Sequence, residues 1–393
     1  MTTPDAPVTT EAPARQVRTV GVEEEMLLVE GQTGQGMTLA GQVLAEVAER
    51  SALAVEEGEE PGDVLGGVLE GELNEEQIEV GSQPHTDMAA LAAELQRWRR
   101  RAGRAARQFG ARVAAVGLSP VPIVPHKVND ERYRRLTEQF GLTAAEQITC
   151  GCHVHVSIAD RSEAVAVIDR IRAWLPALVA LSANSPFWQG RDTSYASYRS
   201  LVMSRWPSAG PTELFRSAEA YDKLVADMVD TGVIMDAGMV YFDARASQRY
   251  PTVEIRVADV CLDVADTVLI AALCRALVDR AATEASAGEE PLEVPVTLLR
   301  LAGWQAARQG ISGDLLDPVT MRPAPAWEVL EVLLERLRPA LRANGDETLV
   351  EDGLERIRLH GTGAARQRRV YQRTGSLEDV VADTVRVTAG MEH

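Results

Sequence analysis

Residues 149–158 read Thr-Cys-Gly-Cys-His-Val-His-Val-Ser-Ile, and polar and apolar side chains alternate along this segment with a period of two. That period is typical of a β-strand with one polar and one apolar face. His153 and His155 therefore project to one side of the predicted strand, and Val154 and Val156 to the other. The segment predicts a sheet that packs on one face and presents imidazole groups on the other.

Three further segments repeat this design, with ionisable side chains on one face and aliphatic side chains on the other. They are residues 19–30, 77–80 and 252–257. The ionisable residues on their polar faces are Glu23, Glu25, Glu79, Glu254 and Arg256. If the four strands share one antiparallel sheet, one face packs on helices and the other is charged. A single acidic strand is more often a solvated edge, so the argument depends on all four together.

Glu72 adds a fifth carboxylate if residues 68–80 form two strands joined by a short turn. Five carboxylates within about 4 to 6 Å of one another cannot all ionise without compensation, because each negative charge raises its neighbour's pKa. Divalent cations supply that compensation. Carboxylate oxygens with one or two imidazoles suit Mg²⁺ or Mn²⁺ better than Zn²⁺, and such cation sites commonly hold nucleotide phosphates.

Four cysteines are present, and Cys150 and Cys152 lie too close together on one predicted strand to bridge distant segments. The sequence therefore shows no disulfide framework, which favours a reducing, cytoplasmic location. A zinc site of Cys150, Cys152 and His153 is a weaker alternative, because no second cysteine or histidine pair lies nearby. Cys261 and Cys274 are expected to be small buried side chains.

The 393-residue chain carries a formal net charge of −18. Nucleic-acid binding depends largely on Lys and Arg, so nucleic acid is not an expected partner. The sequence has no apolar run of about 18 residues, and no membrane span is expected. Residues 1–18 mix Thr, Pro, Ala and acid, which predicts a disordered tail rather than a signal peptide. We expect residues 19–393 to form one domain, which could also assemble as a homo-oligomer.

Helical periodicity dominates the remainder of the chain. The predicted helices lie near residues 39–55, 86–107, 130–140, 162–184, 213–231, 263–287, 296–309, 326–344 and 347–360. Thr86 is the expected N-cap of the second helix, and Pro176 predicts a kink near Ala173 in the fourth. We expect a short strand at 113–118, a hairpin of 241–246 with 252–257, and loops at 56–67 and 185–210. The longer loop is rich in aromatic and basic residues, which is typical of functional loops.

The four strand motifs together resemble those of the glutamate–cysteine ligase type 2, or carboxylate-amine ligase, family of the glutamine synthetase superfamily. The motifs are Gly-Val-Glu-Glu-Glu at 21–25, Gln-Ile-Glu-Val at 77–80, Gly-Cys-His-Val-His-Val at 151–156 and Thr-Val-Glu-Ile-Arg-Val at 252–257. Residues 192–199 and 363–368 extend the resemblance, which covers about residues 19–373. It implies an α+β fold with a curved, mainly antiparallel sheet, helices on its outer face, and ATP with two or three Mg²⁺ ions on its concave face.

The resemblance also implies roles for individual residues. Glu25, Glu72 and Glu79 would hold one ion, although Glu70 or Glu75 could take the place of Glu72. Glu23, His153 and Glu254 would hold another, with His155 as a less favoured ligand. Arg256 would contact the transferring phosphoryl group, because its planar donor fork suits phosphate oxygens. Arg199 and Arg205 are candidates for the substrate carboxylate, and Arg366 and Arg368 for closing over the nucleotide or product.

The activity implied by the family is an ATP-dependent ligation. A carboxylate, with the γ-carboxylate of glutamate as the expected one, would attack ATP to form an acyl phosphate, and cysteine or another amine would then displace phosphate. A phosphotransferase on the same scaffold, which forms no amide, is one alternative. A non-catalytic ATP or metal sensor is the other.

Overall fold

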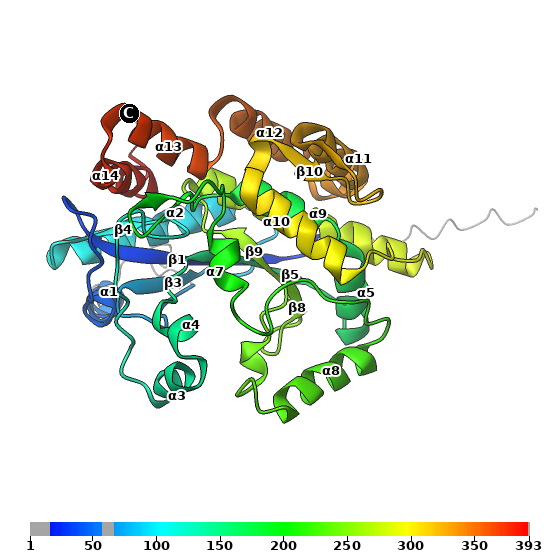
Figure 1. Ribbon diagram of the computed structural model, residues 1–393, viewed down its shortest axis with the longest axis horizontal. Helices are drawn as coiled ribbons and strands as arrows, with labels where there is room; N and C mark the ends of the chain where they lie inside the picture. Colours follow the sequence, from blue (N-terminus) through cyan, green and yellow to red (C-terminus); the bar gives the residue numbers. More distant parts are fainter. Residues whose placement is uncertain (1–15, 57–66, 392–393) are drawn as a thin grey trace, which may run out of the picture.

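The computed structural model describes residues 16–56 and 67–391. Its centre is an open sheet of seven strands with the order β2-β3-β1-β5-β9-β8, in which β4 pairs with the far half of β1 (Figure 1). All pairings are antiparallel. The strands are β1 (Val20–Glu30), β2 (Val68–Gly71), β3 (Gln77–Gly81), β4 (Ala111–Ala114), β5 (Gly151–Ser157), β8 (Ala244–Ala246) and β9 (Thr252–Asp259). The predicted α+β class and antiparallel sheet are confirmed.

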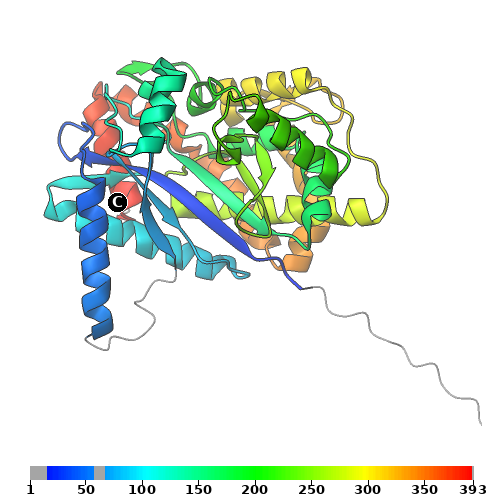
Figure 2. The same cartoon turned by 90° about the horizontal axis from the view of Figure 1, so that it is seen from below.

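β1 is the longest strand and runs through the middle of the molecule, where it is drawn in blue in Figure 2. Its side chains alternate between the two faces of the sheet. Val20, Val22 and Met26 are buried, whereas Glu23 and Glu25 project from the opposite face and are only partly buried. The period-two pattern in the sequence therefore specifies which face of β1 is polar.

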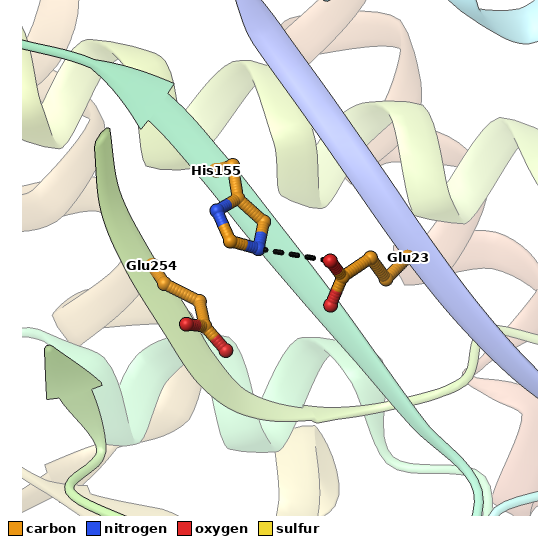
Figure 3. A group of neighbouring side chains, drawn as sticks. All are labelled: Glu23, His155 and Glu254. Atoms are coloured by element: carbon orange, nitrogen blue, oxygen red, sulfur yellow. Dashed lines mark ion pairs between the residues drawn. The ribbon is translucent and has the colours of Figure 1, made fainter. Parts of the chain in front are cut away.

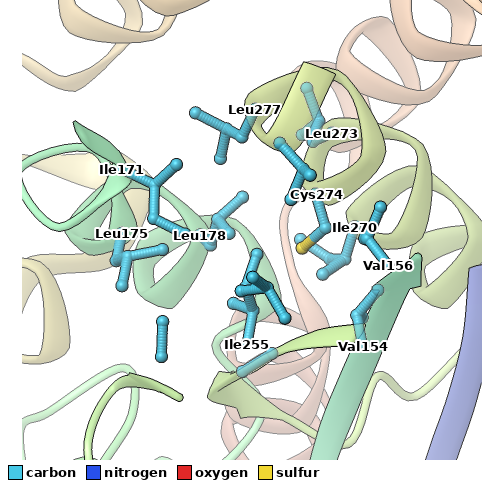
Figure 4. Packing of buried hydrophobic residues seen from close by; sticks show 14 of the residues in the cluster. Val154, Val156, Ile171, Leu175, Leu178, Ile255, Ile270, Leu273, Cys274 and Leu277 are labelled. Atoms are coloured by element: carbon cyan, nitrogen blue, oxygen red, sulfur yellow. The ribbon is translucent and has the colours of Figure 1, made fainter. Parts of the chain in front are cut away.

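The apolar face of the sheet packs on three helices: α5 (Arg161–Ile171), α6 (Leu175–Ser182) and α9 (Val264–Ser286). In Figure 4, Val154 and Val156 of β5 face α9. Cys152 lies in this core together with Cys274 of α9, and all four cysteines are free and buried. Cys152 is thus on the opposite side of β5 from the histidines, and Cys150 is buried in a separate core. The described residues therefore do not bring Cys150, Cys152 and His153 together as a zinc site.

A second core lies between the β4 end of the sheet and α1 (Ala40–Glu56), α2 (Met88–Gln108) and α14 (Leu377–Thr388). The other long C-terminal helices are α10 (Val296–Gln309), α11 (Ala326–Asn344), α12 (Glu347–His360) and α13 (Gly363–Thr374). In Figure 1, α11 to α14 lie above the sheet, whereas α3 (Glu131–Phe140) and α8 (Ala218–Asp230) lie below it. No helix in the described part of the chain is long and apolar enough to cross a membrane.

Several sequence-based bounds need correction. Asp87, not Thr86, caps α2, because its side chain accepts a hydrogen bond from the backbone N–H of Ala89 at 2.8 Å. Residues 162–184 are not one kinked helix but α5 and α6, and Pro176, which has no N–H, stands in the first turn of α6. The short strand β4 ends at Ala114, earlier than expected. Neither α13 nor α14 was predicted.

The expected 185–210 loop contains short elements: β6 (Phe187–Trp188), β7 (Arg191–Asp192) and α7 (Arg199–Met203). The expected tail up to residue 15 and most of the expected 56–67 loop fall outside the described residues. Arg18, which we included in the tail, is held in place by ion pairs with Glu163 at 2.6 Å and Asp279 at 2.9 Å.

A buried ion pair fixes β1 to the helices behind it. Glu24 faces away from Glu23 and Glu25, and Arg99 of α2 donates two hydrogen bonds to its carboxylate, at 2.6 and 2.9 Å. Thr267 of α9 donates a third at 2.6 Å. Arg99 also donates to the carbonyl oxygens of Cys261 and Leu262, each at 2.8 Å. Both charges are completely buried, and their hydrogen bonds are what make that burial tolerable.

We expect Arg99→Ala to lower the free energy of unfolding by about 3 to 5 kcal/mol, because the Glu24 carboxylate would remain buried without its cation. Urea denaturation measures the change. Arg104→Ala on the exposed side of the same helix is the matched control and should shift stability by no more than about 0.5 kcal/mol. Equal effects from the two substitutions would show that the buried pair does not hold β1.

Candidate active site

The polar face of the sheet forms the floor of a cavity of about 710 Å³, which we call the main cleft. Its walls come from α3, α7 and the segments 236–238 and 245–250. The ionisable residues on its floor are Glu23, Glu25, Glu72, Glu79, His153, His155, Glu254 and Arg256. Four strands that are distant in sequence thus deliver their charged side chains to one place.

Strand register sets the order of these side chains. Glu25 lies directly opposite Glu79 in the β1–β3 pair, and Glu23 lies opposite His153 in the β1–β5 pair. His155 lies opposite Glu254 in the β5–β9 pair. Directly opposed residues bring their Cβ atoms within about 5.5 Å of each other. Each ionisable group is therefore close enough to interact with the one on the neighbouring strand.

The first ligand group consists of Glu25, Glu72 and Glu79, each of which offers a carboxylate oxygen within 4.8 Å of the others. Burial raises the pKa of Glu79 well above its usual range, and a hydrogen bond to Glu72 and nearby negative charges raise it further. Burial and the charge of Glu72 likewise raise the pKa of Glu25. An all-carboxylate group with this repulsion fits a hard divalent cation, and Glu72 joins it rather than Glu70 or Glu75.

The second ligand group consists of Glu23, His155 and Glu254, again within 4.8 Å (Figure 3). His155 Nε2 is buried, lies 3.3 Å from Glu23 Oε1 and has no hydrogen-bond partner within the described part of the chain. Its Nδ1 lies 3.0 Å from Thr252 Oγ1, a contact that fixes the ring and leaves Nε2 free to act as a ligand when Nδ1 carries the proton. Burial alone would raise the pKa of Glu23, but its contacts with the His153 and His155 rings hold it far below its usual range.

The geometry thus places His155, not the expected His153, with Glu23 and Glu254. His153 is nearby, with Nδ1 3.3 Å from Glu23 Oε2. The physical reason is a β-bulge: between the opposed pairs Cys152/Ala258 and Val154/Ile255, His153 faces two residues of β9, Arg256 and Val257. Burial, with the neighbouring charge of Arg256, lowers the pKa of His153, which favours a neutral ring.

Two arginines hold Glu254. Arg245 of β8 donates Nε to Oε2 at 2.6 Å and Nη2 to Oε1 at 3.1 Å, and Arg256 pairs with Oε1 as well. Burial would raise the pKa of Glu254, but the charges of Arg256 and then Arg245 lower it to about 2. Sequence reasoning missed Arg245, although its position in the predicted hairpin, opposite Glu254, could have indicated it.

Arg199 lies at the site as expected. Its side chain is buried in α7, Nη1 is 4.0 Å from Asp259 Oδ1, and Nε is buried without a hydrogen-bond partner among the described residues. It lines both the main cleft and an adjoining cavity of about 290 Å³, which we call the side cavity. A buried cation with an unused donor at the junction of two cavities is suited to bind a substrate carboxylate.

The other three candidate arginines lie away from the site and line neither the main cleft nor the side cavity. Arg205 pairs with Glu146 at 2.8 Å. Arg366 of α13 pairs with Asp383 at 2.7 Å. Arg368 pairs with Asp192 at 2.6 Å and donates to the carbonyl oxygen of Tyr195 at 2.8 Å, so it fixes the 185–198 loop. Their basic character was visible in the sequence, but their ion-pair partners were not.

Sequence relatives extend over nearly the whole chain. A protein of Streptomyces coelicolor with the provisional name glutamate–cysteine ligase 2 is 54% identical over 372 residues, which cover 95% of this chain and 99% of that protein. A protein of Frankia alni with the provisional name glutamate–cysteine ligase 2-2 is 47% identical and covers 95% of this chain and 98% of its own.

Solved structures of low sequence identity share the fold. The glutamate–cysteine ligase of Francisella tularensis in complex with AMP has a TM-score of 0.67 at 12% identity, with 96% of this chain and 90% of that chain covered. A bifunctional glutathione synthetase from Pasteurella multocida has a TM-score of 0.68 at 15% identity and covers 95% of this chain, but only 52% of its own.

The family model described as glutamate–cysteine ligase family 2 matches residues 19–383. This match covers all four strand motifs and every residue of the two ligand groups. The protein therefore belongs to glutamate–cysteine ligase family 2.

Proposed function

We propose that the protein is an ATP-dependent ligase that joins a carboxylate, with the γ-carboxylate of glutamate as the expected one, to an amine through an acyl phosphate. The observation that carries the proposal is the pair of ligand groups on one sheet face, with Arg256 beside them, in a member of this family. Cysteine and other amino acids or amines are candidate acceptors. ADP and phosphate are the other products.

The donors in the main cleft fit Mg²⁺ or Mn²⁺, because five of the six are carboxylates and the sixth is an imidazole. Glu25, Glu72 and Glu79 would hold one ion. Glu23 and Glu254, with His155, would hold a second, and His153 stands close enough to Glu23 to orient that carboxylate. When bound, such ions neutralise charge on the phosphate oxygens of ATP.

Arg256 is the proposed contact for the phosphoryl group in transfer. It lines both cavities, so it stands where a phosphoryl donor in the main cleft meets an acceptor. The Arg256 guanidinium is held by Glu254 and lies 6.0 Å from the centre of the Tyr241 ring. These contacts fix the planar fork in one orientation, which favours charge stabilisation without reorganisation.

Arg199 is the proposed contact for the carboxylate substrate. Its Nε is buried and has no hydrogen-bond partner in the described residues, and its side chain lies at the junction of the two cavities. We no longer assign Arg205, Arg366 or Arg368 to substrate or nucleotide. Each already forms an ion pair outside the cavities, and recruiting it would require that pair to break.

The reaction itself can be tested with purified, dialysed protein. Phosphate release from ATP should require a carboxylate, an amine and Mg²⁺ together, and mass spectrometry should detect the amide. A phosphorylated product without amide would instead indicate the phosphotransferase alternative. ATP binding without turnover for every substrate pair would indicate a sensor.

The first ligand group predicts different outcomes for two neighbouring glutamates. Glu72→Gln should raise the Mg²⁺ concentration required for half-maximal activity by at least about 10-fold, because the amide brings a neutral oxygen in place of a charged ligand. Glu70→Gln is the matched control: Glu70 also lines the main cleft but is exposed and belongs to neither ligand group. Titration of phosphate release against Mg²⁺ measures both, and a larger effect at Glu70 would contradict the assignment.

A second pair of variants tests the fork geometry of Arg256. Arg256→Lys should lower kcat by about 10²- to 10³-fold, because a single ammonium cannot supply the same planar set of donors. Arg205→Lys should leave kcat nearly unchanged, since Arg205 pairs with Glu146 outside the cavities. Full activity of Arg256→Lys would exclude Arg256 from phosphoryl stabilisation.

A further inference from the structure

The side cavity differs in character from the main cleft that it adjoins. Most of its wall is apolar and comes from α6, α7 and α10. The apolar residues that line it include Leu175, Val179, Leu201, Phe242, Leu299 and Trp304. At about 290 Å³ it lies near the lower end of the range for small-molecule sites. His153, Arg199 and Arg256 line both cavities, so a molecule here would reach the reacting end of a substrate in the main cleft.

One carboxylate, Asp243, lines this apolar cavity. Its backbone is fixed, because its N–H donates to the carbonyl of Gly210 at 3.0 Å and its own carbonyl accepts from the N–H of Arg256 at 2.9 Å. Its carboxylate forms no hydrogen bond or ion pair with any described residue. Burial raises the pKa of Asp243 to about 7, and the charge of Arg300 on α10 opposes that rise.

The other charged or titratable groups around the side cavity are His153 of β5, Arg199 of α7, Tyr241, Arg256 of β9 and Arg300 of α10. None of them is an anion. Asp243 is therefore the single acceptor-only carboxylate among the described residues that line the cavity, and its lone pairs are available to a ligand.

We infer that the side cavity receives the amine substrate, that this amine carries an apolar body, and that Asp243 accepts the proton that makes its nitrogen nucleophilic. The inference rests on the proposed function and extends it to the acceptor. The apolar wall would bind the body of the amine, and Asp243 would bind its ammonium group. Arg199 and Arg256, which line both cavities, would lie on the side of the acyl phosphate.

The proton balance of the step is complete with the groups named. The ammonium R–NH₃⁺ gives one proton to the Asp243 carboxylate and becomes R–NH₂. Its lone pair then forms the N–C bond to the acyl carbon, and the bond from that carbon to the phosphate oxygen breaks. The second proton leaves nitrogen with the departing phosphate as HPO₄²⁻, so one amide and one protonated Asp243 remain. General base catalysis of this kind commonly contributes about 10²- to 10⁴-fold.

The experiment separates amine activation from acyl phosphate formation. Hydroxylamine is small and uncharged at neutral pH, so it traps the acyl phosphate without needing a base or an apolar cavity. With L-glutamate and ATP, wild-type protein and Asp243→Asn should form the hydroxamate at similar rates. With phenethylamine at pH 7, Asp243→Asn should form amide at least about 100-fold more slowly. Asp227→Asn, an exposed site paired with Lys223, is the control and should match wild type in both assays.

The pH dependence provides a second readout. Amide formation by the wild type should show kcat/KM rising with pH through about 7, as Asp243 loses its proton, and then levelling. In Asp243→Asn the rise of kcat/KM near pH 7 should be absent. The rate should instead continue to increase at higher pH, where more of the amine is unprotonated. A purely structural role for Asp243 would produce no such rescue.

The cavity itself is tested by Gly303→Leu. Gly303 lines the side cavity from α10, and a Cβ placed there meets no atom within 4 Å, so the leucine would extend into free space. Glycine inside a helix is less stable than leucine by about 0.5 to 1 kcal/mol, so folding should not suffer. KM for phenethylamine should rise at least 10-fold, methylamine should be less affected, and the hydroxamate rate should stay unchanged.

The outcomes are distinguishable. If the wild type forms no hydroxamate from L-glutamate and ATP, the proposed function fails and the inference with it. If hydroxamate forms but Asp243→Asn retains amide formation at pH 7, only the role of Asp243 is overturned. If methylamine has a higher kcat/KM than phenethylamine, and Gly303→Leu changes the KM of neither amine, the proposal that the acceptor carries an apolar body is wrong.

Discussion

The register of β5 between β1 and β9 is the constraint on which the site depends. Side chains alternate along a strand, so a slip of one residue would turn both histidines toward α9 and both valines toward the cleft. The apolar face prevents such a slip, because Val154 and Val156 are fully buried against the helices. The hydrophobic core therefore determines the positions of the charged groups, even though Val154 and Val156 themselves do not line the main cleft.

The charges on the polar face are arranged as a gradient. The β3 side holds three carboxylates that repel one another, whereas the β8 side pairs its one carboxylate with two arginines. Glu79 is consequently pushed toward its neutral form and Glu254 toward its ionised form. The side cavity lies at the arginine end, where a negatively charged acyl phosphate would be most stable.

Sequence patterns sufficed for most of the sheet and for the carboxylates. Alternation identified β1, β3, β5 and β9, and the polar positions of those strands do converge in space. The choice between His153 and His155 could not be made in this way, because it depends on a bulge in β9 that leaves no period-two signature. The arginines show the same limit. Arg199 and Arg205 look alike in sequence, and only tertiary contacts separate the buried Arg199 from Arg205, which pairs with Glu146.

The Gly-Val-Glu-Glu-Glu motif contains three consecutive glutamates. Glu23 and Glu25 face the main cleft, whereas Glu24 is buried on the opposite face, and its burial has a consequence for cation binding. Arg99 and Thr267 hold the Glu24 carboxylate from behind, and the backbone carbonyls of Cys261 and Leu262 hold Arg99 in turn. This network opposes any movement of β1 that would separate the carboxylates on its other face. The carboxylates therefore stay close together and repel one another, because the strand does not move to separate them. A divalent cation would neutralise this repulsion on binding. Because the backbone is already ordered, little of the binding free energy would be lost to conformational entropy. Glu24, which would not touch the cation, would thereby help to set how tightly the cation was held.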